Sequence, residues 1–412
     1  MAVWEFNKGE WTEAYVFLRL LGDGRIYGAS AQLVKVDKTY IDIINVIRDE
    51  PNCYMKFERF MEERLSLVKA TDRDDGVIKI ITAPELSEKA AFLYKQIMSL
   101  RAGQKKTISV PEIQLFLEEL KFKNPKANLS DSAKEQYGSK TDIIITSQNS
   151  LDNSRTTEGF SIKSHMGSNP TLFNMSQTSG FKYLIPGCKI EDMHRINALD
   201  SIKTMISAIQ ERFSLRYLGC RNDIFEQNIG IVDSRMDEIL NEALLLFYGY
   251  RGDEVASNME SICVHLAQRN PLNVKNPNVF YIAKIKDLLF ASFAGLTASS
   301  PWNGRKKLTG GYIDVSTDGD LLYYRAISDD IFSSYLFQNT KFEVPDRGVN
   351  KALALKRANV FIQERRDLTL EEENAIIYKS TGKKASKKGN FGYIYQQEEE
   401  FYIDLNFQIR FR

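Results

Sequence analysis

The sequence predicts a mixed α/β fold, and three observations support this prediction. Apolar residues recur at helical spacing near the N-terminus and again from about residue 195 to 295. Residues 141–146 and 159–164 have the β-branched or alternating pattern of strands, and strand-like segments return after residue 307. Helical spacing and strict alternation are the patterns that distinguish amphipathic helices from half-buried strands. We therefore expect helices packed on a central mixed sheet.

The first element is a helix predicted over Glu10–Leu21. Trp11, Tyr15 and Leu18 share one face of this segment, and Gly22-Asp23-Gly24 ends it. The acidic residues of its first turn suit the positive end of the helix dipole. Further helices are predicted over residues 55–68, from about residue 84, and from residue 111, where a proline occupies an allowed first-turn position.

Two strands are predicted next. Thr141–Thr146 is rich in isoleucine and threonine, which favours a strand. Gly159–Ser164 alternates apolar and polar residues and is the expected pairing partner. The polar residues 147–159 are expected to form a long loop between them, so that the whole unit is a hairpin.

The rest of the chain divides into a helical and a β-rich part. Helices are expected over residues 198–213, 234–247 and 279–293. Strands over 310–315 and 321–324 flank an Asp-Gly step, which favours a hairpin turn, and residues 401–411 alternate as one strand. Residues 349–377 are expected to be a charged helical insertion. We expect a core over residues 1–190, a helical segment over 191–300 and a β-rich part over 301–412.

Composition narrows the class of protein. The 412 residues include 43% hydrophobic residues, which is ordinary for a globular protein and provides a large core. Lys and Arg number 55 and Asp and Glu number 54, so a nucleic-acid surface must be a local patch. The four cysteines form no CxxC pair and the three histidines are scattered, which argues against a disulfide framework and a zinc cluster. Because no segment has the pattern of a signal peptide or a membrane span, we expect a cytoplasmic protein.

Three charged residues form the most informative constellation. Asp142 opens the first predicted strand, Lys163 lies near the end of the second, and Glu13 lies on the first helix. A carboxylate and a lysine on neighbouring strand ends can converge at one sheet edge, where a packed helix can add a second carboxylate. Oxygen ligands suit a hard cation such as Mg²⁺, and a lysine can position water and offset developing charge. Each residue alone is more often a turn, surface or first-turn residue.

These three residues also match a motif of a known nuclease superfamily. The order Asp142 … Ser161-Ile162-Lys163 resembles the motif of the PD-(D/E)xK nucleases, and Lys8-Gly9 … Glu13 resembles the first helix of that superfamily. More specifically, the chain resembles the HpaII family of type II restriction endonucleases. The matching blocks keep their order along the chain and cover residues 5–13, 159–164, 170–174, 339–343, 391–395 and 405–411.

The resemblance implies a restriction-endonuclease-like core and a Mg²⁺-dependent enzyme that cuts double-stranded DNA at a short, GC-rich palindrome. It implies that Asp142 binds metal, with Glu10 and Glu13 as further candidate ligands, and that Lys163 orients water. Ser161 occupies the (D/E) position of the motif and is included in the catalytic set. The second acid must therefore come from elsewhere, with Glu13 as first choice and Glu158 as second.

Several polar and basic residues are candidate DNA contacts. A dense polar stretch follows Lys163, a basic cluster lies near residue 305, a lysine-rich stretch lies at 383–388, and other polar residues lie in the C-terminal blocks. Amide side chains can read bases, and lysines neutralise phosphates. For most of these residues, a plain surface position is the alternative. The candidates are His165, Thr171, Asn174, Gln177, Arg305, Lys306, Asn339, Lys341, Lys387, Lys388, Gln408 and Arg410.

Two alternatives stay open at this point. One is a structure-specific or repair nuclease of the same superfamily, and the other is a DNA-binding protein that has lost catalysis. The chain lacks the GxxxxGK[ST] phosphate loop, which argues against an ATP-driven restriction motor. A palindromic target favours a homodimer on DNA or paired monomers, and a cognate DNA methyltransferase is the expected functional partner.

Overall fold

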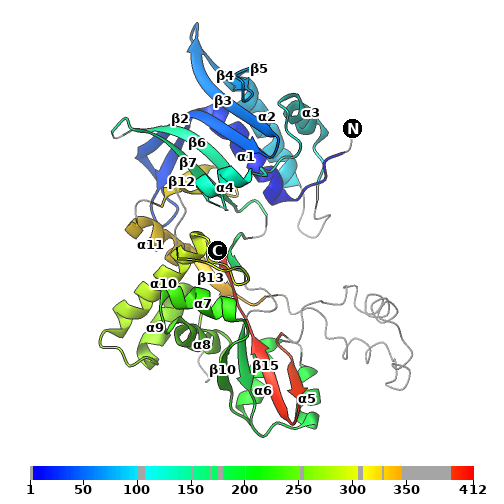
Figure 1. The fold of residues 1–412 in the computed structure, drawn as a ribbon, viewed down its shortest axis with the longest axis vertical. Coiled ribbons are helices and arrows are strands. Elements are labelled where there is room, and N and C mark those ends of the chain that lie inside the picture. Colours follow the sequence, from blue (N-terminus) through cyan, green and yellow to red (C-terminus); the bar gives the residue numbers. More distant parts are fainter. Residues whose placement is uncertain are drawn as a thin grey trace, which may run out of the picture.

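The computed structural model describes residues 3–99, 107–138, 140–150, 152–167, 169–174, 180–199, 201–250, 255–304, 310–326, 329–345 and 391–412. The molecule is elongated and has two parts (Figure 1). One part holds a large mixed sheet with helices α1–α4, and the other holds helices α5–α11 with two small sheets. The predicted mixed α/β class is confirmed.

The large sheet contains strands from both ends of the chain, in the order β1-β12-β11-β7-β6-β2-β3-β4-β5. Its strands are β1 (Arg25–Ala29), β2 (Lys35–Glu50), β3 (Cys53–Glu62), β4 (Leu65–Thr71), β5 (Val77–Thr82), β6 (Ile143–Asn149), β7 (Arg155–Ser164), β11 (Gly311–Val315) and β12 (Leu321–Arg325). The sheet is mixed, because β7 pairs with β11 and β1 with β12 in parallel while the other pairs are antiparallel. An additional antiparallel pairing of β1 with β2 closes six of the strands into a ring.

Four helices accompany this sheet: α1 (Lys8–Asp23), α2 (Ala83–Ser99), α3 (Pro111–Glu119) and α4 (Asp131–Tyr137). Asn7 and Glu10 form a reciprocal capping box that starts α1, and Gly24 ends it in the left-handed conformation with φ of 73°. Trp11, Tyr15 and Leu18 are fully buried, so the predicted apolar face is confirmed. This face packs in the core between α1, α2 and the sheet, which fixes the position of the first turn of α1 relative to the strands.

The second part of the molecule has a separate hydrophobic core, which extends to Tyr312 and Tyr324 on strands β11 and β12 of the large sheet. Its helices are α5 (Ile190–Asn197), α6 (Ile202–Gln210), α7 (Asp223–Val232), α8 (Met236–Phe247), α9 (Met259–Arg269), α10 (Pro277–Phe293) and α11 (Asp329–Asn339). The sheet β10-β9-β15-β14 contains β9 (Phe181–Leu184), β10 (Arg216–Cys220), β14 (Ile394–Gln397) and β15 (Glu400–Leu405). The sheet β13-β16-β8 contains β8 (Thr171–Asn174), β13 (Thr340–Glu343) and β16 (Gln408–Phe411).

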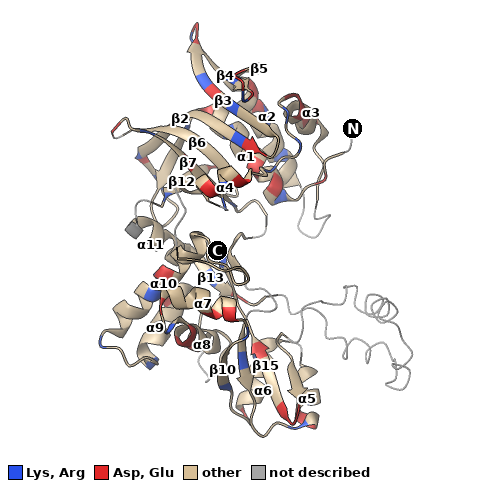
Figure 2. Ribbon diagram, viewed as in Figure 1, with Lys and Arg blue, Asp and Glu red and all other residues tan. Residues whose placement is uncertain are grey.

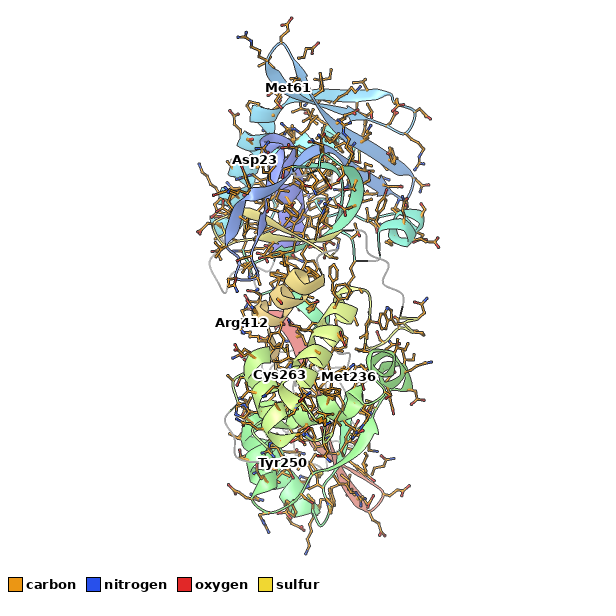
Figure 3. The ribbon with its side chains drawn as sticks, turned by 90° about the vertical axis from the view of Figure 1, so that its left-hand side faces the viewer. Asp23, Met61, Met236, Tyr250, Cys263 and Arg412 are labelled. Carbon is orange, nitrogen blue, oxygen red and sulfur yellow. The ribbon has the colours of Figure 1, made fainter. Side chains whose placement is uncertain are left out.

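The C-terminus lies between the two parts of the molecule (Figure 1). Met236, Tyr250 and Cys263 lie in the second part, whereas Met61 lies near the free end of the β3–β4 hairpin (Figure 3). The C-terminal Arg412 lies at the level between the two parts (Figure 3), and its backbone N–H donates to the carbonyl of Asn339 over 2.9 Å. The ring of Phe411 on β16 lies 5.7 Å from the ring of Tyr312 on β11, so the last strand ends close to the large sheet.

The helix predicted over residues 55–68 is wrong. These residues form the antiparallel pair β3 and β4. Glu63 and Arg64 make the turn between the strands with φ values of 47° and 68°. Two-residue hairpin turns of this kind usually contain Asn or Gly, so the sequence here carried no turn signal.

Two other element predictions need correction. The loop predicted over residues 147–159 is mostly strand, because β6 runs to Asn149 and β7 begins at Arg155; Thr146 and Thr157 pair across the hairpin with their hydroxyls 2.9 Å apart. The single strand predicted over residues 401–411 is two strands in different sheets. The Tyr248 hydroxyl donates to the carbonyl of Asn406 over 2.6 Å, between β15 and β16, so this carbonyl is bonded outside both ladders. The insertion predicted over residues 349–377 lies outside the described residues.

Strands β11 and β12 come from the part of the sequence expected to be C-terminal and β-rich, and they lie in the sheet formed by the N-terminal residues. The three-way division of the chain into domains stays a prediction. Acidic and basic residues are interspersed over both parts (Figure 2). None of the helices in the described ranges is long and apolar enough to cross a membrane.

Candidate active site

Asp142 lies directly before β6, an inner strand, at the edge of the large sheet that is formed by the ends of its strands. Its Oδ2 accepts hydrogen bonds from the Ser161 hydroxyl over 3.0 Å and from the Ile162 backbone N–H over 2.7 Å. Antiparallel pairing of β6 with β7 brings these donors to Asp142, since its own N–H donates to the Phe160 carbonyl over 2.9 Å. Burial raises the pKa of Asp142, while the Lys163 ammonium and these hydrogen bonds oppose the shift.

Lys163 lies two residues after Ser161 on β7, and a strand places residues two apart on the same face. Its Nζ lies 4.9 Å from the centroid of the Tyr312 ring on the neighbouring strand β11. Burial lowers the pKa of the Lys163 ammonium, and the carboxylates of Asp142 and Glu13 oppose this shift. The lysine therefore lies within electrostatic range of both predicted acids.

Glu13 comes from the second turn of α1, which meets the same edge of the sheet. Its Oε2 accepts a hydrogen bond from the Ala127 backbone N–H over 2.9 Å. Burial, followed by the neighbouring Asp142 carboxylate, raises the pKa of Glu13 to about 8. The charge of Asp142 therefore disfavours ionisation of Glu13, and a cation between the two carboxylates would relieve this repulsion.

The other candidate acids have different surroundings. Glu10 pairs with Lys126 over 2.8 Å through one oxygen and caps α1 through the other by accepting from Asn7 N–H over 2.9 Å. Glu158 is 3% exposed and pairs with Arg325 over 2.5 Å. Because Glu158 and Lys163 differ by an odd number of positions on β7, they point to opposite faces. The geometry therefore favours Glu13 over both Glu10 and Glu158 as the partner of Asp142.

The donor set fits a hard divalent cation. Within the described part of the chain, the hydrogen bonds to Asp142 and Glu13 use Oδ2 and Oε2, so one oxygen of each carboxylate accepts none. Both residues are largely shielded from solvent, but each keeps part of its surface exposed. Paired carboxylate oxygens are typical ligands of Mg²⁺, which completes its shell with water. Among the described residues, no group of three or more His, Cys, Asp and Glu side chains is positioned to hold a metal.

Sequence reasoning missed two neighbours of this site. Asp314 is in register with Lys163 on β11, is 3% exposed, and accepts from the Tyr335 hydroxyl over 2.8 Å. Lys140 donates to the Ser292 carbonyl, and burial followed by the Lys163 charge lowers its pKa to about 8. The pairing of β11 with β7 and the contact between Lys140 and Ser292 are long-range, so no local pattern pointed to either residue.

Most of the candidate DNA contacts that the structure describes have partners within the protein. His165 Nε2 lies 3.3 Å from Asp314 Oδ2. The Asn339 amide donates to the Ala31 carbonyl over 2.6 Å, so it is part of the internal framework. Thr171 and Lys341 are half-buried strand residues.

The three-stranded sheet holds the remaining described candidates. Glu343 accepts from the Gln408 amide over 3.2 Å and pairs with Arg410 over 2.8 Å. Asn174, opposite Gln408 on β8, is exposed. The other candidates, Gln177, Arg305, Lys306, Lys387 and Lys388, lie outside the described residues. Of the described set, Asn174 is thus the side chain best placed to meet a partner.

Comparison with known proteins gives this geometry a context. The family model described as HpaII restriction endonuclease matches residues 7–351. The chain is also 30% identical over 409 residues to the type II restriction enzyme HpaII of Haemophilus parainfluenzae, with 98% of each chain covered. The chain belongs to the HpaII restriction endonuclease family. No solved structure gives a significant match.

Membership in the HpaII family confirms the resemblance inferred from the ordered blocks. It also confirms the predicted enzyme class, a type II site-specific deoxyribonuclease, and with it an interaction with DNA. All three residues at the sheet edge fall within the stretch matched by the HpaII family model.

Proposed function

We propose that this HpaII-family enzyme hydrolyses double-stranded DNA at a short, GC-rich palindrome in a Mg²⁺-dependent reaction, with Asp142, Glu13 and Lys163 as its catalytic centre. The single observation that supports this most is the meeting of these charges at one sheet edge, where Asp142 raises the pKa of Glu13 and both act on Lys163. Perturbed ionisable groups gathered at one accessible place are typical of active sites.

Each side chain has a distinct role in this proposal. Asp142 and Glu13 would hold Mg²⁺, which when bound would stabilise negative charge on the phosphate and activate water. The Ser161 hydroxyl and the Ile162 N–H orient Asp142 rather than contact the metal. The Lys163 ammonium orients the water that attacks phosphorus and offsets charge on the phosphate. The bond from phosphorus to the 3′ oxygen breaks, giving a 5′-phosphate and, after proton uptake, a 3′-hydroxyl.

A palindromic target has two-fold symmetry, and this symmetry suggests how the protein assembles on DNA. Two copies related by a two-fold axis present the same site to both strands, so we propose a homodimer on DNA, in a cell that protects its own DNA with a cognate methyltransferase. We propose Asn174, together with the basic residues near 305 and 387, as DNA contacts, because amides read bases and lysines bind phosphates. A cytoplasmic location belongs to the same proposal.

The decisive experiment combines digestion with binding. Unmodified plasmid incubated with the wild-type protein and Mg²⁺ should give discrete bands, and sequencing of the ends should reveal one palindrome. The Asp142→Asn variant should lose cleavage by several orders of magnitude but retain specific binding in Ca²⁺. Cleavage by this variant at the wild-type rate would exclude Asp142 as ligand. Discrete binding without any cleavage by the wild-type protein would indicate a catalytically inactive DNA-binding protein, and cleavage governed by DNA structure would indicate a repair-type nuclease.

A further inference from the structure

The segment between α3 and α4 lies against Glu13 and contains no helix or strand over residues 124–130. Its backbone is nevertheless held at many points. The carbonyls of Asn124 and Lys126 both accept from Nη2 of Arg48, the former over 3.0 Å. The Asn128 N–H donates to Glu50 over 3.2 Å, and the Ser130 N–H donates to the Asp49 carbonyl over 2.7 Å. The end of β2 therefore fixes the course of this segment.

Arg48 and Glu50 form a buried ion pair that serves this purpose. Each is 6% exposed, and Arg48 Nε lies 2.6 Å from Glu50 Oε1. The Arg48 guanidinium also lies 4.0 Å from the centroid of the Phe122 ring. Burying two charges is costly unless further hydrogen bonds satisfy them, and the carbonyls of residues 124 and 126 supply those bonds. The planar fork of arginine suits several acceptors at once, which lysine does not.

The same segment contacts the candidate metal site. Ala127 lies between Lys126, whose carbonyl Arg48 holds, and Asn128, whose N–H Glu50 holds. The Ala127 N–H donates to Glu13 Oε2 over 2.9 Å. Lys126 pairs with Glu10 one turn earlier on α1. We propose that Arg48 is a positioning residue for Glu13: with Glu50 it fixes residues 124–128 so that the Ala127 N–H holds one oxygen of Glu13 and directs the other toward the cation. This inference rests on the metal role of Glu13 in the proposed function.

A residue that orients a metal ligand should affect the metal affinity of protein that still folds. Loss of such an outer contact typically weakens metal binding by roughly 10- to 100-fold. We expect Arg48→Lys, which keeps the charge but loses the fork, to weaken Mn²⁺ binding to the metal-free protein to this extent. The readout is free Mn²⁺ measured by electron paramagnetic resonance, without DNA, alongside the unfolding temperature.

A matched control is Arg221→Lys. Arg221, directly after β10, pairs over 2.6 Å with Asp404 on β15 of the four-stranded sheet. This variant disturbs an arginine–carboxylate pair in which only the carboxylate is buried, away from Glu13, and it should bind Mn²⁺ like the wild type. Glu50→Gln is the second test variant, because it removes the partner charge at constant size. It keeps the inference testable if Arg48→Lys fails to fold.

The outcomes separate this inference from the proposed function. If Glu13→Gln loses Mn²⁺ binding while folded Arg48→Lys and Glu50→Gln both bind like the wild type, the positioning role is wrong and the metal role of Glu13 stands. If Glu13→Gln binds Mn²⁺ like the wild type, or the wild type binds none, the proposed metal role fails and the inference fails with it. If Arg48→Lys and Arg221→Lys lose Mn²⁺ affinity equally, the loss reflects a general loss of stability. That result would also overturn the inference.

Discussion

The hydroxyl of Ser161 donates a hydrogen bond to the carboxylate of Asp142 over 3.0 Å. Ser161 is 5% exposed and lies two positions before Lys163, where the motif of the PD-(D/E)xK nucleases has an acid. A second acid at this position would face Asp142 at close range, whereas a hydroxyl donates to it. The serine therefore orients the carboxylate of Asp142, and Glu13 on α1 brings a second carboxylate within electrostatic range of it.

Removing this hydroxyl should reduce catalysis without abolishing it. Ser161→Ala leaves the Ile162 N–H as the remaining donor to Asp142 Oδ2, so the carboxylate is held less firmly. We expect the single-turnover cleavage rate to fall by about 10- to 100-fold, as for other contacts that orient metal ligands. Ser147→Ala is the control, because Ser147 on β6 is 1% exposed and its hydroxyl has no partner among the described residues. An unchanged rate in Ser161→Ala would mean that the backbone bond alone orients Asp142.

The identity of the second acid can be decided by three matched amide substitutions. Glu13→Gln removes the charge that faces Asp142 and should leave almost no cleavage in Mg²⁺. Glu10→Gln and Glu158→Gln should be milder, because these carboxylates pair with Lys126 and Arg325. Cleavage rates at saturating Mg²⁺ test the order. A nearly inactive Glu158→Gln beside an active Glu13→Gln would reverse the assignment.

Glu13 should also make the metal-free protein sensitive to pH. Its pKa is raised from 4.5 to about 8, mainly by burial, so the folded state holds this proton more tightly than the unfolded state. The free energy of unfolding should therefore decrease as pH rises from about 4.5 to about 8. Glu13→Gln lacks this proton and should lose less stability over that interval. Urea unfolding in a chelator at several pH values measures the difference, and parallel curves for the two proteins would contradict it.

Lys163 should affect catalysis more than DNA binding. Lys163→Ala removes the group that orients water, and contributions of this type are roughly 10²- to 10⁴-fold. Binding to the cognate duplex in Ca²⁺ should change little. Neutralising Lys387 and Lys388 together should instead weaken binding to all DNA and reduce its salt dependence. Gel shifts at two salt concentrations, with single-turnover cleavage, compare the variants. Loss of binding in Lys163→Ala would make this residue a DNA anchor.

The pair of His165 and Asp314 should stabilise the fold most at low pH. The hydrogen bond to Asp314 raises the pKa of His165, so the charged histidine is favoured in the folded state. This contribution is fully present below the unfolded pKa of about 6.5 and is lost as pH rises through the folded value. His165→Gln should therefore reduce the free energy of unfolding more near pH 5.5 than near pH 9. Urea unfolding of the variant and the wild type at both pH values measures this difference. His194→Gln, at an exposed position on α5, is the control. An equal loss at both pH values would show that the charge of His165 contributes nothing.

Local patterns were sufficient for much of the fold. The apolar face of α1 and the hairpins β6–β7 and β11–β12 follow from periodicity and turn residues, and all are present. The β3–β4 hairpin was missed because Glu63 and Arg64 form its turn without Asn or Gly. Strands β1 and β2 were not predicted at all, because their burial depends on partners elsewhere in the chain.

The sequence by itself determined the mixed α/β class, the order of the motif from Asp142 to Lys163 and, through its ordered blocks, the family. Only the tertiary structure decided that Glu13 rather than Glu158 lies beside Asp142, that β11 brings Asp314 next to Lys163, and that Arg48 fixes the backbone at Ala127. The reason is physical. The periodicity of side chains is set by the backbone over a few residues, whereas the meeting of charges at a sheet edge depends on pairing between segments that lie more than one hundred residues apart.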